Sequence, residues 1–95
     1  MVKIYCEFIG VLMGKTGRWK SKIMIDEPVT VWTLIQRLLT DFKLEDNILM
    51  DRQSGSIGQN ALVLVNGKEI SVLEGLETRL KDDDLVTIIP VSHGG

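Results

Sequence analysis

The sequence predicts an α+β domain in which a mixed β-sheet packs against one main helix. Apolar and polar residues alternate near both ends of the chain, a pattern typical of strands with one buried face. Between these segments, residues 31–42 carry apolar side chains at helical spacing. The order strand, strand, helix, hairpin, strand therefore predicts two layers, with the helix across one face of the sheet.

Length and composition favour one small globular domain. The chain has 95 residues, of which 44% are hydrophobic and 25% charged. These fractions are close to the globular averages of about 45–50% and about 25%, which excludes a disordered or collagen-like chain. A domain of this size buries roughly 60–65% of its unfolded surface, so little room is left for an internal active-site cavity.

The first two strands are predicted to form an antiparallel hairpin. Residues 2–8 form the first strand, with inward positions Val2, Ile4, Cys6 and Phe8. A Gly-containing connection over residues 10–17 leads to a second strand over residues 19–25, with inward positions Trp19, Ser21, Ile23 and Ile25. Cys6 and Trp19 are therefore expected in the core, while the lysines of the second strand face solvent.

The main helix follows Pro28, with Thr30 as the expected N-cap. Its apolar stripe is Val31, Leu34, Ile35, Leu38, Leu39 and Phe42. Residues 44–50 predict a short helical turn. Residues 51–60, rich in Ser, Gly, Asn and Gln, predict a loop.

A second hairpin and a final strand complete the predicted sheet. The apolar run 61–65 meets Asn66-Gly67, which suits a tight turn because both residues tolerate positive φ, and continues into residues 68–70. Residues 81–84 form a polar turn. The last strand, residues 85–90, is apolar on both faces apart from Thr87, as expected inside a sheet.

Charge and cysteine content exclude several function classes. The net charge is −2, so nucleic acid is not the expected partner, although residues 1–22 hold five cations against Glu7 alone. Cys6 is the single cysteine, which rules out an internal disulfide and a cysteine-based metal site. We expect no metal site and a reducing, cytoplasmic location, because the chain lacks a signal-peptide core and an apolar run of about 18 residues.

Gly14-Lys15-Thr16 superficially suggests a phosphate-binding loop. The spacing fails, because Gly10 lies too close to Gly14 and the residues that follow alternate like a strand rather than a helix. A glycine-rich hairpin connection explains the same residues.

Three other candidate sites have simpler explanations. The segment containing Lys15, Arg18, Lys20 and Lys22 around Trp19 could bind RNA, but alternation turns Trp19 inward and leaves a solvated basic face that suits acidic protein surfaces. The acids of residues 82–84 are expected to face solvent in their turn. Cys6 and His93, the only thiol and imidazole, are too far apart to form a nucleophilic pair.

The end of the chain is the strongest candidate site. Residues 91–95 follow a well-patterned strand and extend to about 17 Å if fully stretched. Gly94 and Gly95 have no side chains to obstruct entry into a narrow cleft, and they leave an unhindered α-carboxylate. A carboxylate is a poor acyl donor, so another protein must activate it, most economically with a nucleoside triphosphate. The alternative is a frayed terminus without a function.

The sequence resembles the ubiquitin-like sulfur carriers, a family that comprises the small subunit of molybdopterin synthase, the thiamine sulfur carrier, and the ubiquitin-related and small archaeal modifiers. The likeness covers nearly the whole chain. Its specific portions are residues 63–68, residues 78–91 and the terminal Gly94-Gly95. Family members often have glycine at the position of Asp83, and Asp tolerates the left-handed conformation that such a turn needs.

The resemblance implies a β-grasp domain over residues 1–90, with the last strand beside the first, and a flexible tail over residues 91–95. It implies a carrier rather than an enzyme, with no bound cofactor. An activating enzyme using ATP and magnesium would adenylate Gly95. Gly94 would share the reactive end, and the partner would contact Val91, Ser92 and His93.

Three functions remain open. In the first, a sulfur donor converts Gly95 to a thiocarboxylate for a molybdopterin precursor, a thiazole or a tRNA base, with a larger synthase subunit as a further partner. In the second, the glycine forms isopeptide bonds with lysines of other proteins. In the third, the domain is a non-covalent interaction module whose basic hairpin or exposed sheet face binds an acidic partner.

Overall fold

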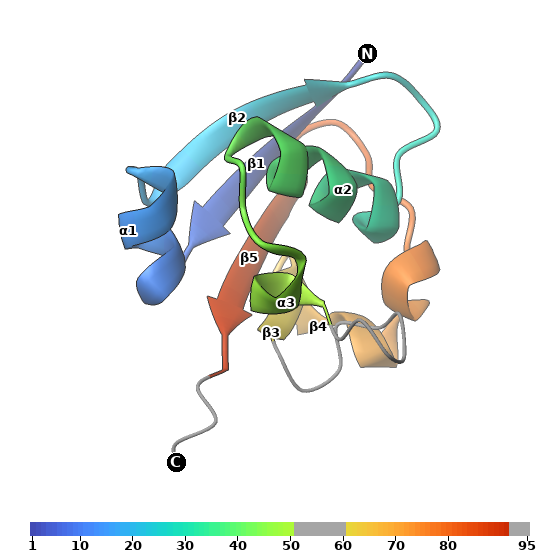
Figure 1. Cartoon of the computed structure of the whole chain (residues 1–95). Coiled ribbons are helices and arrows are strands. Elements are labelled where there is room, and N and C mark those ends of the chain that lie inside the picture. Colours follow the sequence, from blue (N-terminus) through green and yellow to red (C-terminus); the bar gives the residue numbers. More distant parts are fainter. Residues whose placement is uncertain (51–60, 92–95) are drawn as a thin grey trace.

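The computed structural model describes residues 1–50 and 61–91, and it confirms the predicted α+β class (Figure 1). The strands are β1 (Val2–Phe8), β2 (Lys20–Ile25), β3 (Ala61–Val65), β4 (Lys68–Glu69) and β5 (Leu85–Pro90). The helices are α1 (Val11–Thr16), α2 (Val31–Asp41) and α3 (Asp46–Leu49), with short 3-10 turns η1 (Ile70–Val72) and η2 (Gly75–Glu77).

The five strands form one mixed sheet in the order β2-β1-β5-β3-β4. β5 lies between β1, to which it is parallel, and β3, to which it is antiparallel. Because both neighbours cover its edges, its backbone groups are satisfied on both sides, as the continuous apolar run predicted. The expectation that the last strand lies beside the first is confirmed.

Helix α2 packs across one face of the sheet and is capped as predicted (Figure 1). The Thr30 hydroxyl accepts a hydrogen bond from the Thr33 N–H at 3.2 Å, and the Thr33 hydroxyl accepts one from the Thr30 N–H at 2.8 Å. This reciprocal capping box satisfies donors that the first helical turn leaves free. The buried positions of α2 are Val31, Leu34, Ile35, Leu38 and Leu39, which form one core with the inward residues of the strands.

The first hairpin differs from the prediction in its connection. β1 and β2 pair antiparallel as expected, but residues 10–17 contain the short helix α1 instead of a simple turn. The buried side chain of Leu12 anchors α1, and Gly10 and Gly17 have positive φ where the chain enters and leaves it. Glycine adopts this conformation without a steric penalty, so the two glycines bound the helix.

The prediction that Trp19 faces the core is wrong, because 61% of this residue is exposed. Regular alternation begins only at Lys20, where β2 starts, and places Ser21, Ile23 and Ile25 inside as predicted. At this end of the sheet, Phe8 packs edge-to-face on Phe42, with ring centroids 5.5 Å apart.

The turns of the second half adopt the predicted conformations. Asn66 and Gly67 both have positive φ in the β3–β4 turn, and Asp83 has φ 71° in the polar turn before β5. β4 is shorter than predicted, because Ile70 begins η1. The predicted short helix near residues 44–50 is α3, and the predicted loop 51–60 lies outside the described residues. No helix in the described part of the chain is long and apolar enough to span a membrane.

Candidate functional site

The candidate site begins where β5 ends at Pro90. Val91, the last described residue, is 40% exposed. Of the predicted site residues, Ser92, His93, Gly94 and Gly95 lie outside the described residues. The structure therefore defines the surface from which these four residues continue.

The position of this exit is fixed by the contacts of β5 with β1. The two strands run parallel, with Phe8 opposite Ile88 in register. Beyond the end of β1, the Ile9 N–H donates a hydrogen bond to the Ile88 carbonyl at 3.1 Å. Since α1 follows directly and contacts both strands, this helix lies beside the end of β5.

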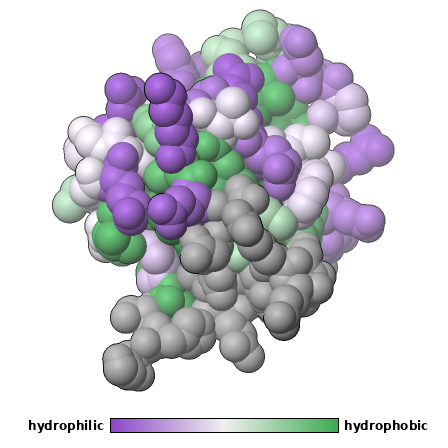
Figure 2. Space-filling view, in the orientation of Figure 1, coloured by the Kyte–Doolittle hydropathy of each residue, from purple (hydrophilic) through white to green (hydrophobic). Residues whose placement is uncertain are grey.

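Large apolar side chains are exposed around the exit. We call this set the apolar rim, and it consists of Ile9, Val11, Met13, Leu62 and Val91, which are 40–55% exposed. Leu62 belongs to it because β3 places this residue opposite Ile89 of β5. Figure 2 shows hydrophobic side chains among hydrophilic ones on the left, over the position of α1.

An apolar surface of this kind favours contact with another protein. The sequence prediction included Val91 alone from this set. The missed signal was the presence of Val11 and Met13 in a segment predicted as a Gly-containing hairpin connection.

The sheet face opposite α2 carries cations and aromatic rings on its β1–β2 side. The Lys20 Nζ lies 5.7 Å from the Tyr5 ring centroid and 5.8 Å from the Trp19 ring, and the Lys3 Nζ lies 5.8 Å from Tyr5. These are cation–π distances. On the same face, the Thr87 hydroxyl donates to the Glu7 carboxylate at 2.9 Å. Of the predicted basic residues, Lys20 and Lys22 occupy exposed positions of β2, and Trp19 is exposed beside Lys20. Arg18 instead lies over the Phe42 ring, 5.7 Å from its centroid.

Cys6 is fully buried, as predicted. Burial raises the pKa of its thiol to about 12, because the charged thiolate would lose its hydration in the core. The thiol is the chain's only one, and it is neutral and inaccessible near neutral pH. It can therefore serve neither as a nucleophile nor as a ligand on the protein surface.

The three consecutive acids before β5 have structural partners. Asp82 accepts a hydrogen bond from the Lys3 N–H at 2.8 Å, and Asp83 lies 3.0 Å from the Lys3 Nζ. Asp84 accepts from the Asn66 side chain at 2.9 Å and from the Lys81 N–H at 2.8 Å. These contacts support the turn, and residues 1–50 and 61–91 contain no group of three side chains suited to hold a metal ion.

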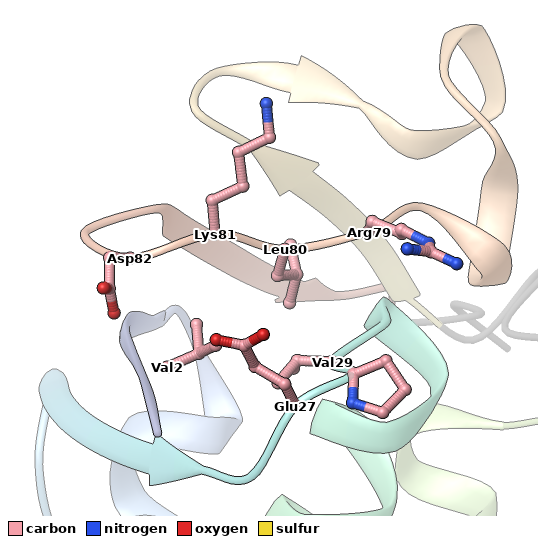
Figure 3. Close-up of a pocket in the computed structure, with 8 residues that line it drawn as sticks. Val2, Glu27, Val29, Arg79, Leu80, Lys81 and Asp82 are labelled. Atoms are coloured by element: carbon pink, nitrogen blue, oxygen red, sulfur yellow. The ribbon is translucent and has the colours of Figure 1, made fainter.

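A hollow of about 480 Å³ lies at the opposite end of the sheet from Pro90. Val2, the first residue of β1, lines it together with Glu27, Pro28, Val29 and residues 79–82. Figure 3 shows the Leu80 side chain pointing toward Val29 and Glu27. Because β1 and β5 are parallel, this hollow cannot adjoin the end of β5.

Comparison with known proteins extends these observations. The family model described as the ThiS family matches residues 6–95. The small archaeal modifier protein 3 of Haloferax volcanii is 27% identical over 95 residues, covering 99% of this chain and 96% of the relative. A putative sulfur carrier protein of Archaeoglobus fulgidus is 33% identical over 69 residues, covering 73% and 77%.

Similarity to solved structures supports the same fold. The crystal structure of the Amycolatopsis orientalis BexX/CysO complex contains a chain that matches with a TM-score of 0.74 at 24% identity, covering 97% of this chain and 99% of that one. The mixed five-stranded sheet with one main helix is the ubiquitin-like β-grasp fold, so this fold prediction is confirmed.

Proposed function

The chain belongs to the ThiS family, and we propose that it is a sulfur carrier whose terminal glycine, Gly95, is charged by a partner enzyme. Carrier and modifier proteins of this family are non-catalytic substrates of activating enzymes. The observation that carries the proposal is the Gly94-Gly95 pair, which comes a few residues after β5 and the exposed Val91.

The proposed chemistry has two steps, both performed on this chain by a partner. A carboxylate oxygen of Gly95 attacks the α-phosphorus of ATP, which forms an acyl adenylate and releases pyrophosphate. Hydrosulfide from a sulfur donor then attacks the carbonyl carbon, so that a C–S bond forms and the C–O bond to AMP breaks. The product is a thiocarboxylate, and magnesium and ATP belong to the partner.

The state of Cys6 supports placing the sulfur at the terminus. A protein can carry sulfur on a cysteine only if the thiolate is accessible. The sole cysteine of this chain is buried and has a pKa raised to about 12. The proposal therefore places the sulfur on the terminal carboxylate and not on the cysteine.

The apolar rim supports docking of the activating partner. Its residues lie in α1 or just before it, in β3 next to β5, and directly after β5, so a protein that covers the rim would receive the terminus beside its own surface. Val91 belongs to the rim, and in this proposal Ser92 and His93 contact the partner's channel. A structural relative has been crystallised in a BexX/CysO complex, which supports a partner enzyme for a protein of this fold.

Intact-mass spectrometry tests the proposal. After incubation with the cognate activating enzyme, ATP, magnesium and sulfide, the protein should gain the mass that corresponds to replacing one oxygen by sulfur. A variant that lacks Gly95 is the control and should gain nothing. An unchanged mass of the full chain, with an activating enzyme shown to be active on another carrier, rejects the proposal.

A second candidate function is covalent modification of other proteins, favoured by the similarity to a small archaeal modifier protein over 99% of the chain. The same adenylate would then pass its acyl group to a lysine, forming an isopeptide bond. Tagged protein expressed in its own cell should form high-mass species that resist denaturant and reductant. Their absence under several stresses would leave the carrier alone.

A further inference from the structure

We propose that this domain has a second binding site, a phosphate-binding hollow lined by the cations Lys68, Arg79 and Lys81. The site lies between the β3–β4 hairpin and the segment before β5, and it is separate from the terminus that the proposed function uses. Its volume is about 270 Å³. The remaining lining residues are Val65, Asn66, Leu73, Thr78 and Asp84.

The backbone around the hollow holds the two cations of the 78–81 segment in place. Arg79 forms a bridge with Thr30 ahead of α2, and the neighbouring Leu80 N–H donates to the Val29 carbonyl at 2.9 Å. The Lys81 N–H is fixed by the Asp84 carboxylate. Arg79 and Lys81 also line the 480 Å³ hollow, and Figure 3 shows the Lys81 side chain extending to the opposite side of its backbone from Glu27 and Val2.

No ion pair neutralises the three cations in the described part of the chain. Among the described side chains, which do not include that of Asp46, no carboxylate lies within ion-pair distance of Lys68, Arg79 or Lys81. Asp84 is the single acid that lines the hollow, and its two oxygens accept hydrogen bonds from the Asn66 amide and the Lys81 N–H. Three cations and one carboxylate thus line the hollow, and both oxygens of that carboxylate already accept hydrogen bonds.

The other acids of this region are directed elsewhere. Asp82 and Asp83 contact Lys3, and Glu69 binds the N–H and hydroxyl of Ser71, which holds the pKa of its carboxyl below the usual value. Glu74 and Glu77 do not line the hollow. In a chain with a net charge of −2, three bases that form no ion pair with a described side chain therefore line one hollow together with a single acid, Asp84.

The shape and charge of the hollow fit a phosphate group. Drug-sized ligands occupy pockets of about 300–1,000 Å³, so this one suits a small, compact anion. A phosphate dianion offers three or more acceptor oxygens to an Arg fork and two Lys ammonium groups, whereas one carboxylate would neutralise a single cation. Free phosphate and a phosphorylated small molecule are both sources of this group.

A titration followed by ¹H–¹⁵N NMR of the full chain tests this site. Inorganic phosphate, added at constant ionic strength against sodium chloride, should give saturable shifts of the amides of Asn66, Lys68, Arg79 and Lys81. AMP should shift the same amides. Tighter binding of AMP than of phosphate would identify a phosphorylated metabolite as the ligand, and equal binding would identify free phosphate.

Charge-removing variants make the test specific. Arg79→Gln with Lys81→Gln, and separately Lys68→Gln, should each weaken phosphate binding about three- to tenfold or more per cation removed. The control is Lys20→Gln with Lys22→Gln, which removes two positive charges, as the Arg79→Gln, Lys81→Gln variant does, but from β2 at the opposite edge of the sheet. It should leave phosphate binding intact. Spectra of each variant report folding, so a loss of binding can be separated from unfolding.

Three results would overturn the proposal. The first is a set of shifts that do not saturate or that chloride reproduces. The second is phosphate binding that is as strong in Lys68→Gln, and in the double variant Arg79→Gln with Lys81→Gln, as in the unmodified protein. The third is binding of a glutamate-rich peptide without binding of phosphate, which would make the hollow a contact for acidic proteins. None of these readouts depends on charging of Gly95, so the two proposals can fail separately.

Discussion

The Ile9 N–H donates a hydrogen bond to the carbonyl oxygen of Ile88, at 3.1 Å. This bond extends the parallel β1–β5 pairing past the end of β1 and brings the start of α1 to the last residues of β5. As a result, Ile9, Val11 and Met13, which are exposed, belong to a segment that contacts β5, the strand that leads to the terminus. In the proposed function, a partner that binds α1 would therefore receive the terminus.

Helix α1 should depend on one buried side chain, that of Leu12. We expect Leu12→Ala to lower the free energy of unfolding by about 2–5 kcal/mol, because the substitution leaves a cavity under α1. Urea denaturation followed by circular dichroism measures this. The control is Val11→Ala, since Val11 is 55% exposed, and it should change stability by less than about 0.5 kcal/mol. Equal effects of both substitutions would contradict this role of Leu12.

The Asn66 side chain joins the β3–β4 turn to the start of β5. Its amide donates to Asp84, and its oxygen accepts from the Leu85 N–H, both at 2.9 Å. Asn66→Ala should lower the free energy of unfolding by about 1–3 kcal/mol, because both hydrogen bonds are lost. Asn66→Gly loses the same bonds but suits the positive φ of 51°, so it should be about 1 kcal/mol less damaging. Chemical denaturation compares the two, and an alanine variant as stable as the glycine variant would argue against the turn geometry.

Stability should fall at high pH because of Cys6. Its pKa is about 12 in the folded protein and 9.0 in a model thiol. The unfolded chain therefore loses the proton first, the folded state binds more protons above pH 9, and stability decreases as pH rises through this window. Between pH about 8 and about 10.5, the free energy of unfolding of the unmodified protein should fall by roughly 2 kcal/mol more than that of the Cys6→Ala variant. Urea unfolding of both proteins measures the difference, and identical pH profiles would show that the thiol ionises freely when folded.

The apolar rim should contribute to recognition by the activating enzyme. Met13→Asp places a charge on a side chain that is 49% exposed, so folding should be unaffected while docking is weakened. We expect kcat/KM for charging of Gly95 to fall about tenfold, equivalent to about 1.4 kcal/mol.

The matched control for this substitution is Val72→Asp. Val72 is 74% exposed and lies in η1, which follows the edge strand β4. The kcat/KM for charging of the Val72→Asp variant should match that of the unmodified protein. If Met13→Asp and Val72→Asp are charged with the same kcat/KM, α1 is not part of the docking surface.

Much of the fold could be predicted because its signals are local. The stripe of α2 and its Thr30 cap, the Asn66-Gly67 turn and the alternation in β1 each depend on residues close together in sequence. The parallel pairing of β1 with β5 joins opposite ends of the chain, and it was expected from the family resemblance rather than from the residues.

Trp19 and α1 could not be predicted because tertiary packing determines them. Trp19 lies in phase with Ile23 and Ile25, but it precedes the strand, so alternation no longer fixes its direction. In α1, six residues with an internal Gly14 have low intrinsic helicity, and burial of Leu12 compensates for it. The apolar rim was missed for the same reason.

The central claim is that the α-carboxylate of Gly95 accepts AMP from ATP. Exchange of labelled pyrophosphate into ATP by the cognate activating enzyme measures this step directly, before any sulfur is transferred. The full chain should stimulate exchange, and a chain extended by one alanine after Gly95, which leaves the domain unchanged, should not. Equal exchange with both chains, or none with the full chain, would contradict the account.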